Sequence, residues 1–128
     1  MIAAFTLIPL TAVALRWPGV TLPHILTLKE SLLRLTAGTV ASIVEETFFR
    51  GWLQTLLSRR LRSVTAIVAT SALFALSHRI AHPEPIFLAT FFPGLVMGLL
   101  RQRHGSIAPA ALYHGLGNLW AVWFFPLP

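Results

Sequence analysis

The sequence predicts an all-α protein, a polytopic transmembrane helix bundle with about five membrane-embedded helices in a single domain over residues 1–128. Of the 128 residues, 55% are hydrophobic and only 11% are charged, whereas soluble domains carry about 25% charged residues. The hydrophobic residues form long segments separated by prolines, glycines and basic clusters. Because cysteine is absent, disulfides and cysteine-based zinc sites are excluded.

Five helical segments are expected, at about residues 2–16, 28–57, 64–78, 86–100 and 107–125. The first is short for a span of about 20 residues. It lacks the basic start and the cleavage site of a signal peptide, so we expect a retained helix. Thr27 and Glu30 have the spacing of a capping box at the start of the second segment. Pro83 and Pro85 mark the break before the fourth.

Two basic clusters predict the orientation. Residues 59–62 follow the second segment, and residues 101–104 follow the fourth. If segments two to five each cross once, both clusters lie on one side, which the positive-inside rule places in the cytoplasm. Loops 17–27 and 82–85 then face outward. Lipid headgroups explain the net charge of +6 better than nucleic acid does, so we expect the lipid bilayer as a partner and no nucleic acid.

Three polar motifs interrupt the hydrophobic segments: Glu45-Glu46-x-x-x-Arg50, Phe74-x-x-x-His78 and His114-x-x-x-Asn118. Ionisable groups in apolar surroundings are costly to desolvate, which makes them candidates for function. A helix rises about 1.5 Å per residue. Measured along each helix from its basic end, the distance is about 20–22 Å to Glu45, to His78 and to Asn118. We therefore expect the three helices to present them at one level, in the outer half of the bilayer.

The two adjacent glutamates have different expected roles. Glu46 and Arg50 share a helix face and have the spacing of an ion pair. Glu45 points about 100° away, along small residues 38, 41 and 42 that suit the close approach of another helix. Glu45 is thus the candidate general base, with Glu46 and Arg50 holding the helix or the substrate. The alternative is that both glutamates neutralise Arg50 and join the bundle.

The histidine motifs also allow two interpretations each. We expect Phe74 to pack against His78 and orient it, although a histidine near a helix end is often solvated or bonded to a carbonyl. His114 and Asn118 share a face and could hold an oxyanion or bond between helices. Zinc bound by Glu45, His78 and His114 stays open, but no H-E-x-x-H pair exists, and we expect no metal and no cofactor. The remaining histidines are expected in loops without assigned chemistry: His24, His82 and His104.

The three motifs, complete and in this order, resemble those of the CAAX-protease and bacteriocin-processing (CPBP, also ABI) family of intramembrane glutamic endopeptidases. Its motifs are E-E-x-x-x-R, F-x-x-x-H and H-x-x-x-N on successive helices. The resemblance covers about residues 35–122, which it marks as a catalytic core. It implies hydrolysis of a peptide bond without a covalent intermediate. Glu45 and His78 would activate a water, which suits a carboxylate beside a neutral imidazole.

The resemblance further implies that His114 and Asn118 stabilise the oxyanion as paired neutral donors, with Glu46 and Arg50 in support. The substrate would be a membrane-anchored peptide or protein, cut near its C-terminal tail. The chain is short for the family and looks like compact myxosortase-type members, which process sorting tails of surface proteins. This suits the bacterial inner (plasma) membrane and an outward-facing site. Two alternatives remain: a non-catalytic scaffold or immunity protein of the same family, and a proton or ion pathway.

Overall fold

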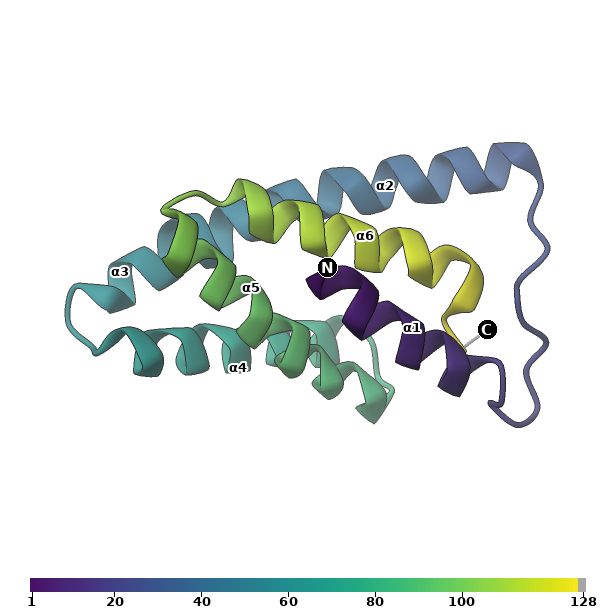
Figure 1. Cartoon of the computed structure of the whole chain (residues 1–128), viewed down its shortest axis with the longest axis horizontal. Coiled ribbons are helices and arrows are strands. Elements are labelled where there is room, and N and C mark those ends of the chain that lie inside the picture. Colours follow the sequence, from purple (N-terminus) through teal and green to yellow (C-terminus); the bar gives the residue numbers. More distant parts are fainter. Residues whose placement is uncertain (127–128) are drawn as a thin grey trace. The chain divides into compact units, whose positions relative to one another are not determined.

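The computed structural model describes residues 1–126, and each of the five expected segments is helical in it (Figure 1). The elements, in chain order, are α1 (Ile2–Ala14), α2 (Leu28–Glu46), the π-helical η1 (Thr47–Leu53), α3 (Gln54–Ser58), α4 (Ser63–Ala81), the 3₁₀-helical η2 (Pro85–Thr90), α5 (Phe91–His104) and α6 (Ala108–Phe124). The prediction of an all-α protein is confirmed. Ser63–Ala81 and Pro85–His104 are long and apolar enough to cross a membrane. A total of about five membrane helices stays a prediction.

The chain divides into two compact units, which we describe separately. The first comprises Met1–Ser42 and the residues from Gly115 onward, and the second comprises Ile43–His114. Helices α2 and α6 therefore each contribute one part to the first unit and one part to the second.

In the first unit, the start of α2 is capped as the sequence predicts. The backbone N–H and the hydroxyl of Thr27 donate to Glu30 Oε2 at 2.9 and 2.7 Å, and the Glu30 N–H donates to Thr27 Oγ1 at 3.3 Å. These bonds satisfy N–H groups that have no partner inside the helix. The capping box is confirmed.

The helices of the first unit are joined by polar side chains and by close packing. The Asn118 amide donates to the Gly38 carbonyl at 2.9 Å, joining α6 to α2. A Cβ atom on Gly38 would meet Asn118 Cβ at 3.1 Å, so the row of small residues on α2 does admit a neighbouring helix. The Trp120 indole donates to Thr11 Oγ1 at 2.7 Å and ties α6 to α1.

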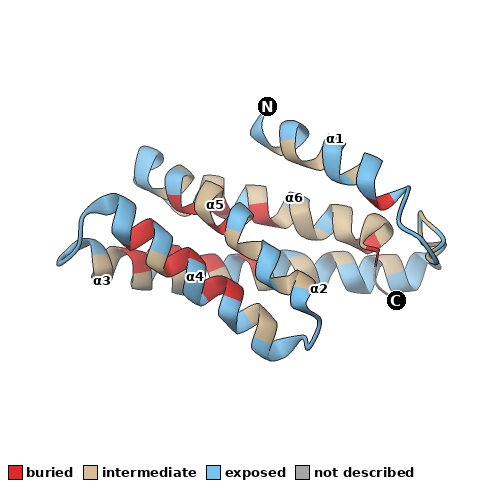
Figure 2. Cartoon of the chain, turned by 90° about the horizontal axis from the view of Figure 1, so that it is seen from below, coloured by how far each residue is buried: buried red, intermediate tan, exposed pale blue. Residues whose placement is uncertain are grey.

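The second unit is built around α4 and α5. Buried positions on α4 form one face, from Ala66 to Ala75, seen in red in Figure 2. Helix α5 approaches this face closely at its glycines: a Cβ on Gly98 would lie 2.7 Å from Ile67 Cγ2, and one on Gly94 would lie 3.1 Å from Ser71 Cβ. The glycines therefore allow a close approach of the two helices that a Cβ at Gly98 would prevent without a shift of Ile67.

The second unit buries two charged side chains and exposes large apolar ones. Glu46 and Arg50 are fully buried, whereas Ile80 and Phe92 are 78% and 68% exposed. Exposed apolar surface of this kind is costly in water and favourable against lipid. The distribution therefore agrees with the composition in indicating a membrane environment.

The helices differ from the expected segments in several places. The second segment is not α-helical throughout, because Thr47–Leu53 forms a π-helix. The fourth segment begins with the 3₁₀ stretch η2, and the α-helix starts only at Phe91. Pro93 explains this start, since its ring has no N–H to donate and clashes with the carbonyl four residues earlier. The third segment extends beyond His78 to Ala81.

The second basic cluster lies inside α5 rather than after it. Arg101, Arg103 and His104 form the last turn of α5, so the placement of His104 in a loop was wrong. Gly105 ends the helix with φ of 64°, a left-handed conformation that glycine adopts readily. Cationic side chains in the last turn also interact favourably with the helix dipole, which explains why the helix continues through them.

Candidate active site

The centre of the second unit holds a buried ion pair. Arg50 Nη1 lies 2.8 Å from Glu46 Oε1, and both side chains are fully buried, as their spacing on one helix face predicts. Arg50 Nη2 donates to the Gly94 carbonyl at 3.1 Å. The guanidinium carbon also lies 4.5 Å from the centroid of the Phe74 ring, a cation–π contact. Arg50 thus ties η1 to both α4 and α5.

The same oxygen of Glu46 also orients His114. His114 Nδ1 lies 3.0 Å from Glu46 Oε1. An ionised carboxylate only accepts hydrogen bonds, so Nδ1 carries the hydrogen. A carboxylate bonded to one ring nitrogen fixes both the orientation and the tautomer of an imidazole. Glu46 therefore supports His114 as well as Arg50, a role that the sequence analysis did not assign to it.

His78 is held by the backbone one turn earlier. Its Nδ1 lies 3.0 Å from the Phe74 carbonyl, which can only accept, so Nδ1 again carries the hydrogen. The imidazole and the Phe74 ring are 4.4 Å apart between centroids, and Phe74 is buried. Phe74 thus packs against His78 as expected, and both imidazoles keep Nε2 for other partners.

Glu45 faces the Nε2 atoms of both histidines. Its Oε2 lies 3.8 Å from His78 Nε2 and 4.0 Å from His114 Nε2. These distances are longer than direct hydrogen bonds. The Oε2 atom is itself buried and has no hydrogen-bond partner among the described residues, although the side chain is 32% exposed. One carboxylate oxygen therefore lies within 4.0 Å of both imidazole nitrogens.

The cluster carries an unbalanced charge. Glu45 and Glu46 are two carboxylates, and Arg50, the cation paired with Glu46, is fully buried against it. His78 and His114 are the remaining basic side chains beside Glu45. This arrangement is suited to taking up and passing on one proton, as general acid–base catalysis requires.

Asn118 belongs to the first unit, one helical turn after His114 on α6. Its amide donates to the Gly38 carbonyl, so bonding between helices, one of the two expected roles, is present. An amide nitrogen carries two N–H groups, and this bond uses one of them. The structure thus brings Glu45, His78 and His114 together within the second unit and gives Asn118 a structural contact in the first.

No group of three histidine, aspartate or glutamate side chains within residues 1–126 has a geometry that could hold a metal ion. This finding gives no support to the zinc site considered from Glu45, His78 and His114.

Gln54 is a buried polar residue that the motifs do not include. It follows Arg50 by one turn, is 5% exposed, and donates from Nε2 to the Gly98 carbonyl at 3.0 Å. Arg50 donates to Gly94 in the same manner, so two side chains one turn apart bond two carbonyls one turn apart on α5. The sequence contains a spacing that could have indicated this role. Gln54 follows Arg50 by four residues, as Arg50 follows Glu46, and Gly94 and Gly98 are also four residues apart.

Comparison with known proteins identifies the family of the chain. The model of a family described as type II CAAX prenyl endopeptidase Rce1-like matches residues 27–120, a range that includes all three motifs. Neither the curated proteins nor the solved structures give a significant match. The matched range covers most of the chain, and the resemblance inferred from the motifs is confirmed. The chain belongs to the Rce1-like family of type II CAAX prenyl endopeptidases, a family of membrane-integral proteases.

Proposed function

We propose that the protein is an intramembrane endopeptidase that hydrolyses a peptide bond near the C-terminal tail of a membrane-anchored protein or peptide. The observation that carries this proposal is the position of Glu45 Oε2, which is buried, lacks a hydrogen-bond partner among the described residues, and faces His78 Nε2 at 3.8 Å. Family membership supports the reaction class.

Glu45 and His78 would activate the attacking water. The hydrogen of His78 lies on Nδ1, bonded to Phe74, so Nε2 presents a lone pair. Two acceptors 3.8 Å apart can share one water molecule that donates a hydrogen bond of about 2.7–3.0 Å to each. Transfer of one proton to this pair leaves hydroxide to add to the peptide carbonyl. The same proton then passes to the leaving amine as the C–N bond breaks.

His114 would stabilise the oxyanion in its protonated form. Because Nδ1–H is bonded to Glu46, a neutral His114 has only a lone pair at Nε2 and cannot donate there. The imidazolium donates from both nitrogens, with Nδ1–H bonded to Glu46 and Nε2–H available to the oxyanion. This differs from the neutral donor that the sequence resemblance implies. The motif resemblance implies Asn118 as the other donor to the oxyanion.

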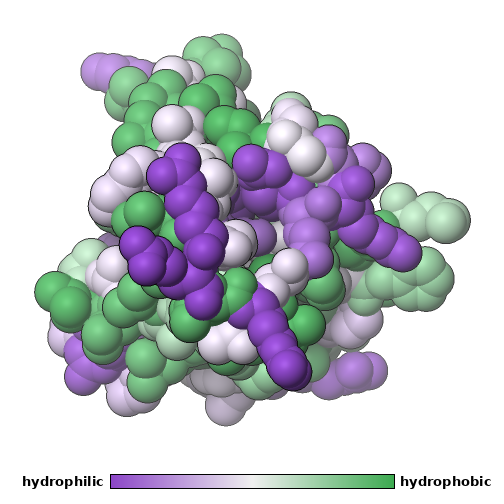
Figure 3. Space-filling model, turned by 90° about the vertical axis from the view of Figure 1, so that its left-hand side faces the viewer, coloured by the Kyte–Doolittle hydropathy of each residue, from purple (hydrophilic) through white to green (hydrophobic). Residues whose placement is uncertain are grey.

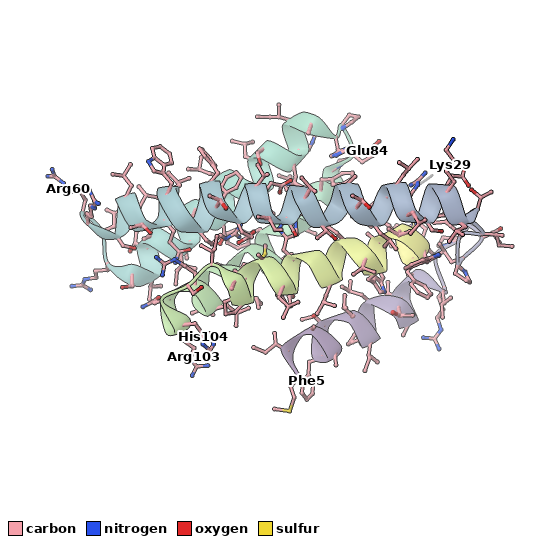
Figure 4. All side chains as sticks on the ribbon, turned by 90° about the horizontal axis from the view of Figure 1, so that it is seen from above. Phe5, Lys29, Arg60, Glu84, Arg103 and His104 are labelled. Carbon is pink, nitrogen blue, oxygen red and sulfur yellow. The ribbon has the colours of Figure 1, made fainter. Side chains whose placement is uncertain are left out.

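The substrate proposal rests on which end of the second unit lies near the site. Figure 4 shows Arg60, Arg103 and His104 at one end of this unit and Glu84 toward the other. His78 lies three residues before the end of α4, on the side of Glu84. If the basic end is cytoplasmic, the site opens toward the outside. A sorting tail of a bacterial surface protein would reach it more directly than a prenylated peptide in the cytosol.

The test is incubation of the purified protein with three membrane-anchored peptides, followed by mass spectrometry of the products. The peptides carry a C-terminal sorting tail, a prenylated CAAX terminus, or an unrelated tail of equal length. We expect one cleavage near the C-terminal tail of the sorting peptide and none in the unrelated peptide. Preferred cleavage of the prenylated peptide would contradict the substrate proposal, and no cleavage of any peptide would support a non-catalytic scaffold.

The same assay tests the alternative of metal catalysis. Each step above is assigned to a protein group, so EDTA or phenanthroline should leave the rate largely unchanged. Complete loss with chelator and recovery with added zinc would instead make Glu45, His78 and His114 ligands. The roles of these residues, though not the location of the site, would then be wrong.

A further inference from the structure

The basic end of the second unit contains a polar hollow apart from the candidate active site. Figure 3 faces this end and shows hydrophilic side chains gathered over it. The hollow has a volume of about 250 Å³ and lies where α3, the start of α4 and the end of α5 meet. Its lining residues are Gln54, Thr55, Ser58, Ser63, Arg101 and Gln102.

Arg101 brings an uncompensated positive charge to the hollow. Its Nη2 donates to Thr55 Oγ1 at 3.4 Å, while its buried Nε has no hydrogen-bond partner among the described residues. The carboxylates of this unit lie elsewhere: Glu45 and Glu46 are within the histidine cluster, and Glu84 is near the opposite end. A guanidinium whose Nε–H lacks a partner among the described residues can still donate a charge-assisted hydrogen bond to a phosphate oxygen.

The start of α4 adds further donors. Ser63 is the first residue of this 19-residue helix and lines the hollow, and the preceding Arg62 makes no side-chain cap. The first N–H groups of a helix have no partner within it and favour an anion nearby. The hydroxyls of Thr55, Ser58 and Ser63 lie around the same space.

Gln54 indicates that the ligand also donates a hydrogen bond. Its side chain is 5% exposed, and its Nε2 is committed to the Gly98 carbonyl, which fixes the orientation of the amide. Oε1 is then a buried acceptor with no partner among the described residues. A bare phosphate ester would satisfy Arg101 but not this oxygen, whereas a headgroup with a hydroxyl would satisfy both.

The position of the hollow favours a lipid. Ser63 begins one of the two stretches that are apolar enough to cross a membrane, and Arg101 and Gln102 lie in the last turn of the other. The hollow is therefore at the level where such helices leave the hydrocarbon region and meet headgroups. Basic pockets between transmembrane helices on the cytoplasmic side are known to bind anionic headgroups.

We propose that this hollow binds the headgroup of an anionic phospholipid, with the phosphodiester on Arg101 and a headgroup hydroxyl on Gln54 Oε1. Lipid in this position bonds side chains of α3 and α5 together. The site does not depend on the proposed peptidase activity, because it shares none of the residues assigned to catalysis.

Native mass spectrometry of the purified protein with added phosphatidylglycerol or phosphatidylcholine tests the proposal. We expect a saturable first phosphatidylglycerol that phosphatidylcholine does not replace. Arg101→Gln should weaken this binding on the order of tenfold, as for loss of one charge-assisted contact. The matched control, Arg103→Gln, removes an equal charge from an exposed residue that does not line the hollow, and should change binding less than twofold.

Equal losses in the two arginine variants would overturn the proposal, since only diffuse attraction to basic residues would then hold the lipid. Displacement of the lipid by equal concentrations of glycerol 1-phosphate or inorganic phosphate would instead assign the hollow to a soluble phosphate. If Arg101→Gln does not fold, Ser58→Phe fills the hollow from an exposed position without changing charge. It should abolish the saturable binding, and unchanged binding would contradict the site.

Discussion

At the scale of single residues, the two adjacent glutamates make different contacts. Glu46 is fully buried, and one of its oxygens holds both Arg50 and His114. Glu45 keeps an unpartnered oxygen beside both imidazoles. The first is suited to holding the site in place and the second to taking part in proton transfer.

Glu46→Gln should therefore reduce stability. Removing one partner of a buried ion pair leaves an uncompensated charge, here on Arg50, at a cost of about 3–5 kcal/mol. Denaturation in detergent, followed by circular dichroism, measures the loss. The double variant Glu46→Gln with Arg50→Gln should lose less than the sum of the single losses. A change under about 0.5 kcal/mol in the single variant would mean that the pair does not support the fold.

His114→Ala and Asn118→Ala should each lower the rate of cleavage on the order of 10²–10³, as for loss of an oxyanion-hole donor. The measurement is single-turnover cleavage of the peptide that the wild type cuts. Since Asn118 also bonds the Gly38 carbonyl, its variant needs a melting curve beside the rate. A lowered melting temperature with an unchanged rate would leave Asn118 a packing role only.

The residues of the candidate site could be identified in the sequence because charge is rare in this chain. Only four acidic residues occur, and two are adjacent in an apolar segment, which draws attention to Glu45, Glu46 and their motif. The sequence could not show which glutamate bonds His114, because neighbouring helical residues differ by about 100° in direction and the packing of α6 decides between them. Gln54 was missed because an amide carries no charge to signal it.

At the scale of helices, α5 depends on glycines for its contact with α4. Ile67 is buried and branched at Cβ, so it cannot move away from an added methyl group 2.7 Å from its Cγ2. The same turn of α5 provides the carbonyl that accepts the Gln54 bond. Packing and polar contacts therefore depend on the same backbone position.

Gly98→Ala should destabilise the protein. The clash costs about 1–3 kcal/mol, and the higher helix propensity of alanine returns at most about 1 kcal/mol. Gly117→Ala is the control, because a Cβ on Gly117 meets nothing within 4 Å, and it should be neutral or slightly stabilising. Melting temperatures of the two variants decide the matter, and equal values would contradict the close contact between α4 and α5.

The sequence predicts a helix end when neighbouring residues determine it. It does not predict helix geometry that contacts with other helices determine. The Thr27–Glu30 capping box is local and was correct. The π-helix Thr47–Leu53 has no such signal, since its residues fit ordinary helical periodicity. It contains Arg50, whose bonds reach Gly94 on α5. Short π-helical stretches are frequent at functional sites, and this one directly follows the two glutamates.

At the scale of the whole molecule, the orientation in the membrane determines which substrates reach the site. Cysteines introduced at Arg60 and Gln102 should react with impermeant reagents only from the cytoplasmic side, and one at Glu84 only from outside. Labelling of intact cells against opened cells measures this. Because the positive-inside rule is the basis of the expectation, the reverse pattern would exclude the outward-facing site and with it the sorting-tail proposal.

The central claim is that Glu45 activates the water that hydrolyses the peptide bond, and Glu45→Gln tests it most directly. Glutamine keeps the size of the side chain but cannot accept a proton at this position. Glu45 carries no structural ion pair comparable to that of Glu46, so the variant should melt near the wild-type temperature. Mass spectrometry of the membrane-anchored peptide should show two fragments with the wild type and almost none with Glu45→Gln. The same fragments at a near-normal rate from the variant would contradict the mechanism.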